Sequence, residues 1–182
     1  VLVLPCAEPT PPPATSARAG GRANMVELAI AGQSYFMCDR RELFRHGKSY
    51  SVDTLRALRT EFGRQKPIVW LIGMDSFLGL AGWHHWRELF SLCHFVIAPR
   101  PEHDLNHIDA NLQAAIVGRW VESSRELIDK PAGSLFLLPM QQRDDSATRI
   151  RLNFEHGRPD NHHLPASVAE YIKIHQLYTS GV

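Results

Sequence analysis

Short, uninterrupted runs of apolar residues recur along the 182-residue chain, and they limit its fold more than any other feature. The runs lie at residues 1–4, 68–73, 95–98 and 135–138. Unbroken apolarity over so few residues is typical of strands that are covered on both faces, as in parallel sheets. Patterns typical of helices lie between the runs, at residues 25–31, 51–62, 86–92 and 106–123. This alternation predicts an α/β fold with a parallel sheet flanked by helices.

Two more helices are expected near the end of the sequence, at residues 146–156 and 165–175. Gly157 and Pro159 would end the first of them, and Pro165 would stand in the first turn of the second. No internal repeat marks a boundary, and a chain of this length can bury one substantial core. We therefore expect a single α/β domain over residues 1–182.

Composition limits the kinds of partner that the protein could bind and the cellular compartment in which it could work. A formal net charge of +1 gives no electrostatic reason for binding nucleic acid or a membrane surface. No apolar run approaches the roughly 20 residues that are needed to span a bilayer. Cys6, Cys38 and Cys93 are odd in number and widely spaced, which favours a reduced, cytoplasmic protein over a disulfide framework. Specific binding of a small molecule remains open.

Candidate ligand-binding residues follow two of the apolar runs. Gly73 ends one run and Asp75 comes directly after it, at the end of a parallel strand where such folds bind ligands. Asp75 could contact a ligand or only cap the next short helix. The proline-rich segment 9–16 follows the first run and is either a simple connection or a cover over a site.

Aromatic and imidazole side chains add further candidates. Trp83 stands in a glycine-flanked loop and could stack on a flat heterocycle, whereas Trp86 is expected to face the core with Leu89 and Phe90. His103 and His107 are one helical turn apart, but Asp104 would have to complete a zinc site and no His-Glu-x-x-His motif or cysteine pair is present. We therefore expect no metal centre built from side chains.

The segment Ser146-Ala147-Thr148-Arg149-Ile150-Arg151 reads as the start of a helix that could hold phosphate. The first backbone N–H groups of a helix lack partners within it and carry partial positive charge. The hydroxyls of Ser146 and Thr148 and the guanidinium of Arg151 would complete an anion-binding site. Ordinary N-capping by Ser146 is the alternative.

These segments occur in the order found in bacterial nicotinate-mononucleotide adenylyltransferases, which the chain resembles over essentially its whole length. Residues 41–55 resemble that family's R-E-L-x-R-x-G-x-S-Y-T-x-D-T-L block. The other matching segments are Arg22 with residues 25–30, Gly73-Met74-Asp75, Gly82-Trp83, Arg100-Pro101, Ser146–Arg151, and residues 164–178.

The resemblance implies a Rossmann-like nucleotidyltransferase fold and an enzyme of NAD biosynthesis. The family transfers the adenylyl group of ATP to nicotinate mononucleotide, which gives deamido-NAD and pyrophosphate. By resemblance, Trp83 would stack on the nicotinate ring, and the loop around Tyr50 and Ser51 would offer donors to the pyridine carboxylate. The nucleotide would lie against Gly73 and Asp75, and Arg100 would line its site.

By the same resemblance, Ser146, Thr148 and Arg151 would hold the phosphates of ATP. Mg²⁺ would accompany ATP, held mainly by phosphate oxygens and water.

Three departures from the family pattern bear on activity. The family's first strand and H-x-G-H segment, roughly 30 residues by the size of a βαβ unit, are not found in this sequence. Pro9-Thr10-Pro11 stands where the family usually has Pro-Pro-His, and Asp145 replaces an apolar residue. We expect the 182 residues alone to be an inactive fragment with the first strand absent. The alternatives are a non-catalytic pyridine-nucleotide-binding module and an adenylyltransferase for nicotinamide mononucleotide or phosphopantetheine.

Overall fold

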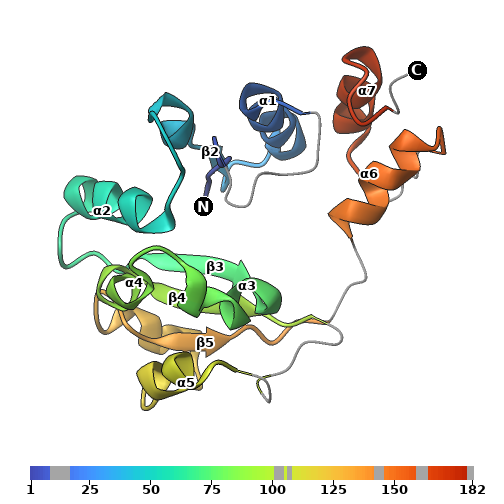
Figure 1. Ribbon diagram of the computed structural model, residues 1–182. Coiled ribbons are helices and arrows are strands. Elements are labelled where there is room, and N and C mark those ends of the chain that lie inside the picture. Colours follow the sequence, from blue (N-terminus) through green and yellow to red (C-terminus); the bar gives the residue numbers. More distant parts are fainter. Residues whose placement is uncertain (9–16, 101–104, 106–107, 142–145, 159–163, 180–182) are drawn as a thin grey trace. The chain divides into compact units, whose positions relative to one another are not determined.

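The computed structural model describes residues 1–8, 17–100, 105, 108–141, 146–158 and 164–179. The chain forms two compact units, and Figure 1 labels helices α1–α7 and strands β2–β5. The first comprises Val1–Ser49 and Asp145–Val182, and the second comprises Tyr50–Asp144. The expectation of a single domain over residues 1–182 stays a prediction.

The second unit contains a three-stranded parallel sheet, seen side by side in Figure 1. Its strands are β3 (Val69–Gly73), β4 (His94–Ala98) and β5 (Leu135–Leu137), in the order β3-β4-β5. The register pairs Gly73 with Ala98, so the carboxyl ends of β3 and β4 lie at one edge of the sheet. The parallel α/β class is confirmed.

Helices of the second unit follow the apolar patterns of the sequence. The unit includes α2 (Ser51–Phe62), α3 (Met74–Leu78), α4 (Trp86–Leu92) and α5 (Ala110–Ile116), with the 3₁₀ turns η2 (Leu80–Gly82) and η4 (Ser124–Ile128). Helix α2 buries Val52, Leu55 and Leu58 along one face, as a period of 3.6 residues requires. Helix α4 buries Trp86, Leu89 and Phe90, which confirms the expectation for Trp86.

The strands differ in how they are covered. All residues of β4 from His94 to Ile97 are buried, as expected for a strand with both faces covered. The same expectation is wrong for β3, because Val69 is 46% and Leu71 is 61% exposed while Ile72 is buried. Successive side chains point to opposite faces of a sheet, so β3 leaves one of its faces open to solvent.

The first unit has a two-stranded parallel sheet and helices from both parts of the chain. Its elements include β1 (Leu2–Val3), α1 (Ala19–Ile30), β2 (Met37–Cys38), η1 (Arg41–Phe44), α6 (Ala147–Glu155) and α7 (Ala166–Ile174). Strand β2 was not expected, although its two residues end a short apolar run over residues 35–38. Helix α1 begins before the expected start at residue 25. Its first turn contains Gly20 and Gly21, which have no apolar side chains and so add nothing to a helical apolar pattern.

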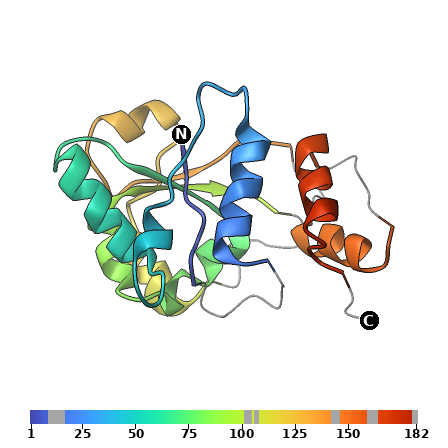
Figure 2. The ribbon, with the colours of Figure 1, turned by 90° about the horizontal axis from the view of Figure 1, so that it is seen from above.

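An apolar cluster joins α1, α6 and α7, and Figure 2 shows α7 beside α1. Phe154, Val168, Ala169 and Ile172 are buried in it, and partly buried residues pack against them: Met25, Leu28, Ile150, Leu164, Leu177 and Tyr178. The first unit therefore has an apolar core of its own, built from residues far apart in the sequence.

Two boundaries differ from expectation. The helix expected over residues 106–123 is shorter, because α5 ends at Ile116 and Gly118 takes a φ of 70°. Ser123 and Glu126 then form a capping box that starts η4. The helices expected at 146–156 and 165–175 are α6 and α7. Among the residues described, no helix is both long and apolar enough to cross a membrane.

Candidate active site

Gly73, Asp75 and Arg100 meet at the carboxyl ends of β3 and β4. Nε of Arg100 lies 3.7 Å from Oδ1 of Asp75, and both side chains are about half exposed. A Cβ built on Gly73 would lie only 2.6 Å from Oδ1 of Asp75 and 3.6 Å from Nε of Arg100. The Asp75 carboxylate therefore occupies the space that any side chain at position 73 would need. The structure brings these three predicted residues together.

Asp75 is not the cap of α3. Gly73 holds the N-cap position, with no capping bond from a side chain, and Asp75 follows in the first turn. Its carboxylate points back over Gly73 toward Arg100 instead of closing the helix. A long, solvent-exposed ion pair is weak, so both groups can exchange this contact for a ligand. The interpretation of Asp75 as the cap of α3 is therefore wrong, and its contact with a ligand stays a prediction.

Trp83 is held in place through its backbone. Its N–H donates to the carbonyl of Leu80 at 3.0 Å, and its carbonyl accepts from the N–H of Trp86 at 3.2 Å. The indole is half-buried. A shallow pocket of about 450 Å³ opens beside this loop, lined by Ala81, Gly82, Trp86, Arg87, Asp109 and Asn111. The residues that line this pocket include Trp86 but not Trp83, so stacking of Trp83 on a ligand stays a prediction.

Tyr50 reaches the same loop through a stacked pair of rings. The rings of Tyr50 and His84 lie 4.3 Å apart at 30°, and the ring of His85 meets His84 edge-on at 4.1 Å. His84 directly follows Trp83, so its stack on Tyr50 links the Trp83 loop to the residue that precedes α2. No spacing or motif in the sequence shows that the His84 ring would meet the ring of Tyr50.

Ser51 is the first residue of α2. Serine is a preferred N-cap residue, but Tyr50 holds the N-cap position of α2, in an extended conformation and with no capping bond through its side chain. Ser51 instead lies in the first turn of the helix, where N–H groups and partial positive charge favour an anion such as a carboxylate.

In the first unit, Ser146, Thr148 and Arg151 lie at the start of α6. Oγ of Ser146 accepts from the N–H of Arg149 at 3.3 Å, and Oγ1 of Thr148 accepts from Nη2 of Arg151 at 3.2 Å. Ser146 is therefore a helix cap, as the alternative interpretation held. A hydroxyl that accepts one bond keeps its own O–H to donate. Capping thus leaves both hydroxyls able to donate to a phosphate oxygen.

The remaining sequence candidates lie elsewhere. Residues 9–16, His103, Asp104, His107 and Asp145 fall outside the described residues. Within the part of the chain that the structure describes, no group of three or more His, Cys, Asp or Glu side chains could hold a metal ion. Cys6, Cys38 and Cys93 are free cysteines.

The sequence matches the cytidylyltransferase-like family over residues 1–153. A probable nicotinate-nucleotide adenylyltransferase of Stenotrophomonas maltophilia is 41% identical over 186 residues, which cover 99% of this chain and 84% of the relative. The chain belongs to the nicotinate-nucleotide adenylyltransferases. A family member of the same name from Methylococcus capsulatus is 38% identical, over 96% of this chain and 83% of its own length.

Solved structures of this family support the fold. Nicotinic acid mononucleotide adenylyltransferase of Plasmodium falciparum, complexed with NaAD, matches with a TM-score of 0.67 at 17% identity, over 97% of this chain and 81% of that one. The same protein complexed with APC matches with a TM-score of 0.64. The Rossmann-like nucleotidyltransferase class expected from the sequence is thereby confirmed, and the chain is a member of an enzyme family.

Proposed function

We propose that the protein transfers the adenylyl group of ATP to nicotinate mononucleotide, giving deamido-NAD and pyrophosphate in NAD biosynthesis. The observation that carries the proposal is the cluster of Gly73, Asp75 and Arg100 at the carboxyl ends of adjacent parallel strands. Parallel α/β sheets bind nucleotides at this edge. The relatives named above, at 38–41% identity, favour this activity over a non-catalytic module or another acceptor.

The residues of the second unit would bind the pyridine nucleotide. Trp83 would stack on the nicotinate ring, and the loop around Tyr50 and Ser51 would donate to its carboxylate. Asp75, over Gly73, would contact the sugar and phosphate side of the nucleotide through hydroxyl groups, and Arg100 would offset negative charge. The ring stack of Tyr50 on His84 supports this assignment, because it holds the α2 segment next to the Trp83 loop.

The residues of α6 would bind the phosphates of ATP. Ser146 and Thr148 would donate from their hydroxyls, and Arg151 would add positive charge at the helix start. The reaction joins a phosphate oxygen of nicotinate mononucleotide to the α-phosphorus of ATP and breaks that phosphorus's bond to the bridging oxygen, which leaves with pyrophosphate. The protein's part is to position the reactants and stabilise charge.

Mg²⁺ would enter with ATP, held on phosphate oxygens and water, which agrees with its preference for oxygen ligands and retained waters. ATP and nicotinate mononucleotide are the proposed small-molecule partners, and we propose no nucleic-acid partner. The free thiols of Cys6, Cys38 and Cys93 suit a reducing compartment, and we propose the cytoplasm.

Competition between acceptors tests the proposed function. The natural protein, with any residues that lie beyond these 182, is given ATP and equal amounts of nicotinate mononucleotide, nicotinamide mononucleotide and phosphopantetheine. Formation of deamido-NAD with one pyrophosphate per dinucleotide, in excess over NAD, is the expected result. Binding of deamido-NAD by calorimetry without turnover would instead support a non-catalytic module. A preference for the amide, or for phosphopantetheine, would make it an adenylyltransferase for another acceptor.

A further inference from the structure

Two side-chain hydrogen bonds with matched spacing join helices α1 and α7. Oγ of Ser167 donates to the carbonyl of Leu28 at 3.3 Å, and Nδ2 of Asn24 donates to Oη of Tyr171 at 3.0 Å. The partners are four residues apart on each helix and run in opposite directions, so α1 and α7 are antiparallel at this contact. Residues four apart are neighbours on one helix face. The two bonds together define the register of α7 on α1.

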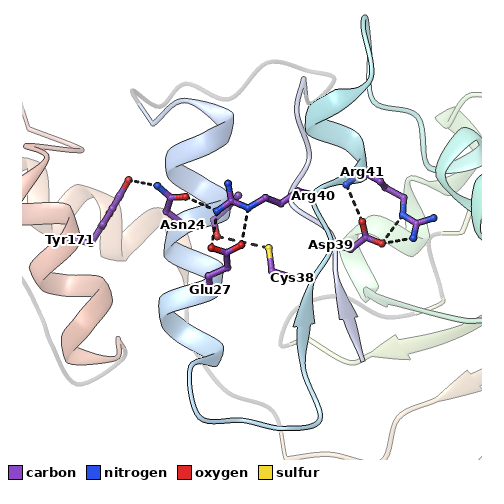
Figure 3. A network of polar contacts seen from close by, with 8 residues as sticks. Asn24, Glu27, Cys38, Asp39, Arg40, Arg41 and Tyr171 are labelled. Atoms are coloured by element: carbon purple, nitrogen blue, oxygen red, sulfur yellow. Dashed lines mark hydrogen bonds and ion pairs between the residues drawn. The ribbon is translucent and has the colours of Figure 1, made fainter.

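Arg40 fixes the orientation of the Asn24 amide. Its Nη2 donates to Oδ1 of Asn24 at 2.6 Å, while its Nε and Nη2 donate to the two carboxylate oxygens of Glu27, each at 2.7 Å (Figure 3). The hydrogen bonds from Arg40 hold the pKa of Glu27 below its usual range. Because Arg40 occupies the amide oxygen, the NH₂ group of Asn24 faces Tyr171.

The same helices carry the segment proposed to bind phosphate. Ile150, in the first turns of α6 between Thr148 and Arg151, packs into the apolar cluster with Ile172 of α7 and Leu28 of α1. Apolar contacts are non-directional, so they hold α6 and α7 together without setting one register. The hydrogen bond between Asn24 and Tyr171 is directional, so it fixes the register of α7 on α1, which the apolar cluster alone does not fix.

We propose that Arg40, Asn24 and Tyr171 are positioning residues that set the place of the α6 phosphate-binding segment through helix α7. None of them needs to touch ATP. This inference rests on the proposed function, because it assigns ATP to α6. It predicts that loss of one hydroxyl far along α7 weakens the binding of ATP and spares the binding of the pyridine nucleotide.

Tyr171→Phe is the decisive variant, since it removes Oη and keeps the ring, which lies 4.1 Å from that of His175. In the natural protein we expect the KM and the calorimetric Kd for ATP to rise roughly three- to ten-fold, the range for one lost hydrogen bond. The KM for nicotinate mononucleotide should change less than about two-fold. Tyr35→Phe is the matched control, because Tyr35 is 81% exposed, and it should leave both constants unchanged.

A second variant tests the chain of bonds. Arg40→Lys replaces a forked guanidinium by a point charge and should release Asn24. If the three residues act as one network, combining it with Tyr171→Phe raises the Kd for ATP little beyond the larger single effect. Fully additive effects would overturn the network.

The outcomes separate this inference from the proposed function. An unchanged Kd for ATP in Tyr171→Phe overturns the positioning role. So does a parallel rise of both KM values with a lower Tm, because that pattern belongs to a merely structural contact. Weaker ATP binding in Tyr171→Phe, in a natural protein that makes no dinucleotide, would support the positioning role and contradict the proposed function.

Discussion

At the scale of single residues, the missing side chain of Gly73 matters as much as the groups beside it. The Asp75 carboxylate lies where a Cβ would stand, and the guanidinium of Arg100 lies next to it. A separation of 2.6 Å is shorter than real Cβ contacts, so any side chain at position 73 must move the carboxylate. The strand end and the carboxylate therefore depend on each other.

Gly73→Ala should displace Asp75 and impair the acceptor site. We expect the KM for nicotinate mononucleotide to rise on the order of ten-fold, because the displaced carboxylate would lose its proposed contact with the nucleotide, and a hydrogen bond to a charged group contributes about 1.5–3 kcal/mol. Steady-state kinetics with each substrate varied in turn measures the effect. Gly20→Ala is the control, since among the described residues no atom outside its own turn of α1 lies within 4 Å of a Cβ built there. An unchanged KM in Gly73→Ala would remove Asp75 from the acceptor site.

The sequence could predict some residue contacts of the site and not others. The family resemblance assigned Gly73 and Arg100 to one site, and the structure shows why they meet: they follow strands that pair in parallel, whose carboxyl ends lie together. The stack of His84 on Tyr50 could not be predicted, because it depends on how a loop meets the segment before α2. Serine is a preferred N-cap, yet Tyr50 and not Ser51 holds the N-cap position of α2, a difference of one residue that propensity does not resolve.

At the scale of secondary structure, the start of α6 has to serve stability and binding at once. Ser146 caps the helix through a lone pair, and the same hydroxyl is proposed to donate to ATP. Removal of the Ser146 side chain would weaken both the helix cap and the proposed contact with ATP, so it could not distinguish the two roles. A replacement that keeps the cap and reverses the charge is more informative.

Ser146→Asp should keep α6 stable while it weakens ATP binding. Aspartate is as good an N-cap as serine and is favoured by the helix dipole, so we expect the Tm to stay the same or rise. Its charge would face the phosphates, and the KM for ATP should increase about ten-fold or more. Ser146→Asn caps without charge and is the control. If Asp and Asn behave alike toward ATP, Ser146 is a cap alone.

Strand β4 carries a buried histidine whose two ring nitrogens are both bonded. Nδ1 of His94 accepts from the N–H of Ser134 at 3.0 Å, and Nε2 lies 2.8 Å from the carbonyl of Lys130. Since a backbone N–H can only donate, Nδ1 is unprotonated and Nε2 carries the hydrogen. Burial lowers the pKa of His94, and the charges of Lys130 and Arg59 lower it further.

The free energy of unfolding should therefore fall in mild acid. Because the folded pKa lies below the ordinary value of about 6.5, the unfolded chain binds more protons as the pH drops through 6.5. The stabilisation is complete above that pH and is lost toward the folded pKa. Urea denaturation between pH 5 and 7.5 measures it, and His94→Asn should flatten the slope. The exposed His156→Gln should retain it; equal slopes for His94→Asn and the natural protein would contradict the assignment.

The apolar patterns predicted the elements best where burial is strongest. Helix α4 and strand β4 lie at the expected residues, since each buries a clear apolar face or run. Helix α5 is shorter than expected, because a turn at Gly118 ends it within a pattern that continues. Strand β2 was missed although residues 35–38 form an apolar run. Only Met37 and Cys38 of that run pair with β1, and Met37 is exposed, so the run does not have the burial that marks the other strands.

At the scale of the whole molecule, the first unit is built from both ends of the chain. Its apolar cluster joins Met25 and Leu28 to Phe154 and Ile172, so it can form only after distant segments meet. The second unit is one continuous stretch, Tyr50–Asp144. No run of linker-like residues marks the crossings near residues 49 and 144, which is why composition did not reveal this division.

The fate of the α-phosphorus of ATP tests adenylyl transfer most directly. The natural protein is incubated with nicotinate mononucleotide and with ATP labelled either at the α- or at the γ-phosphorus. The account predicts that the α label appears in deamido-NAD and the γ label in pyrophosphate, in equal amounts and only when the acceptor is present. Release of the α label as AMP, or no transfer of label to the acceptor, would contradict it.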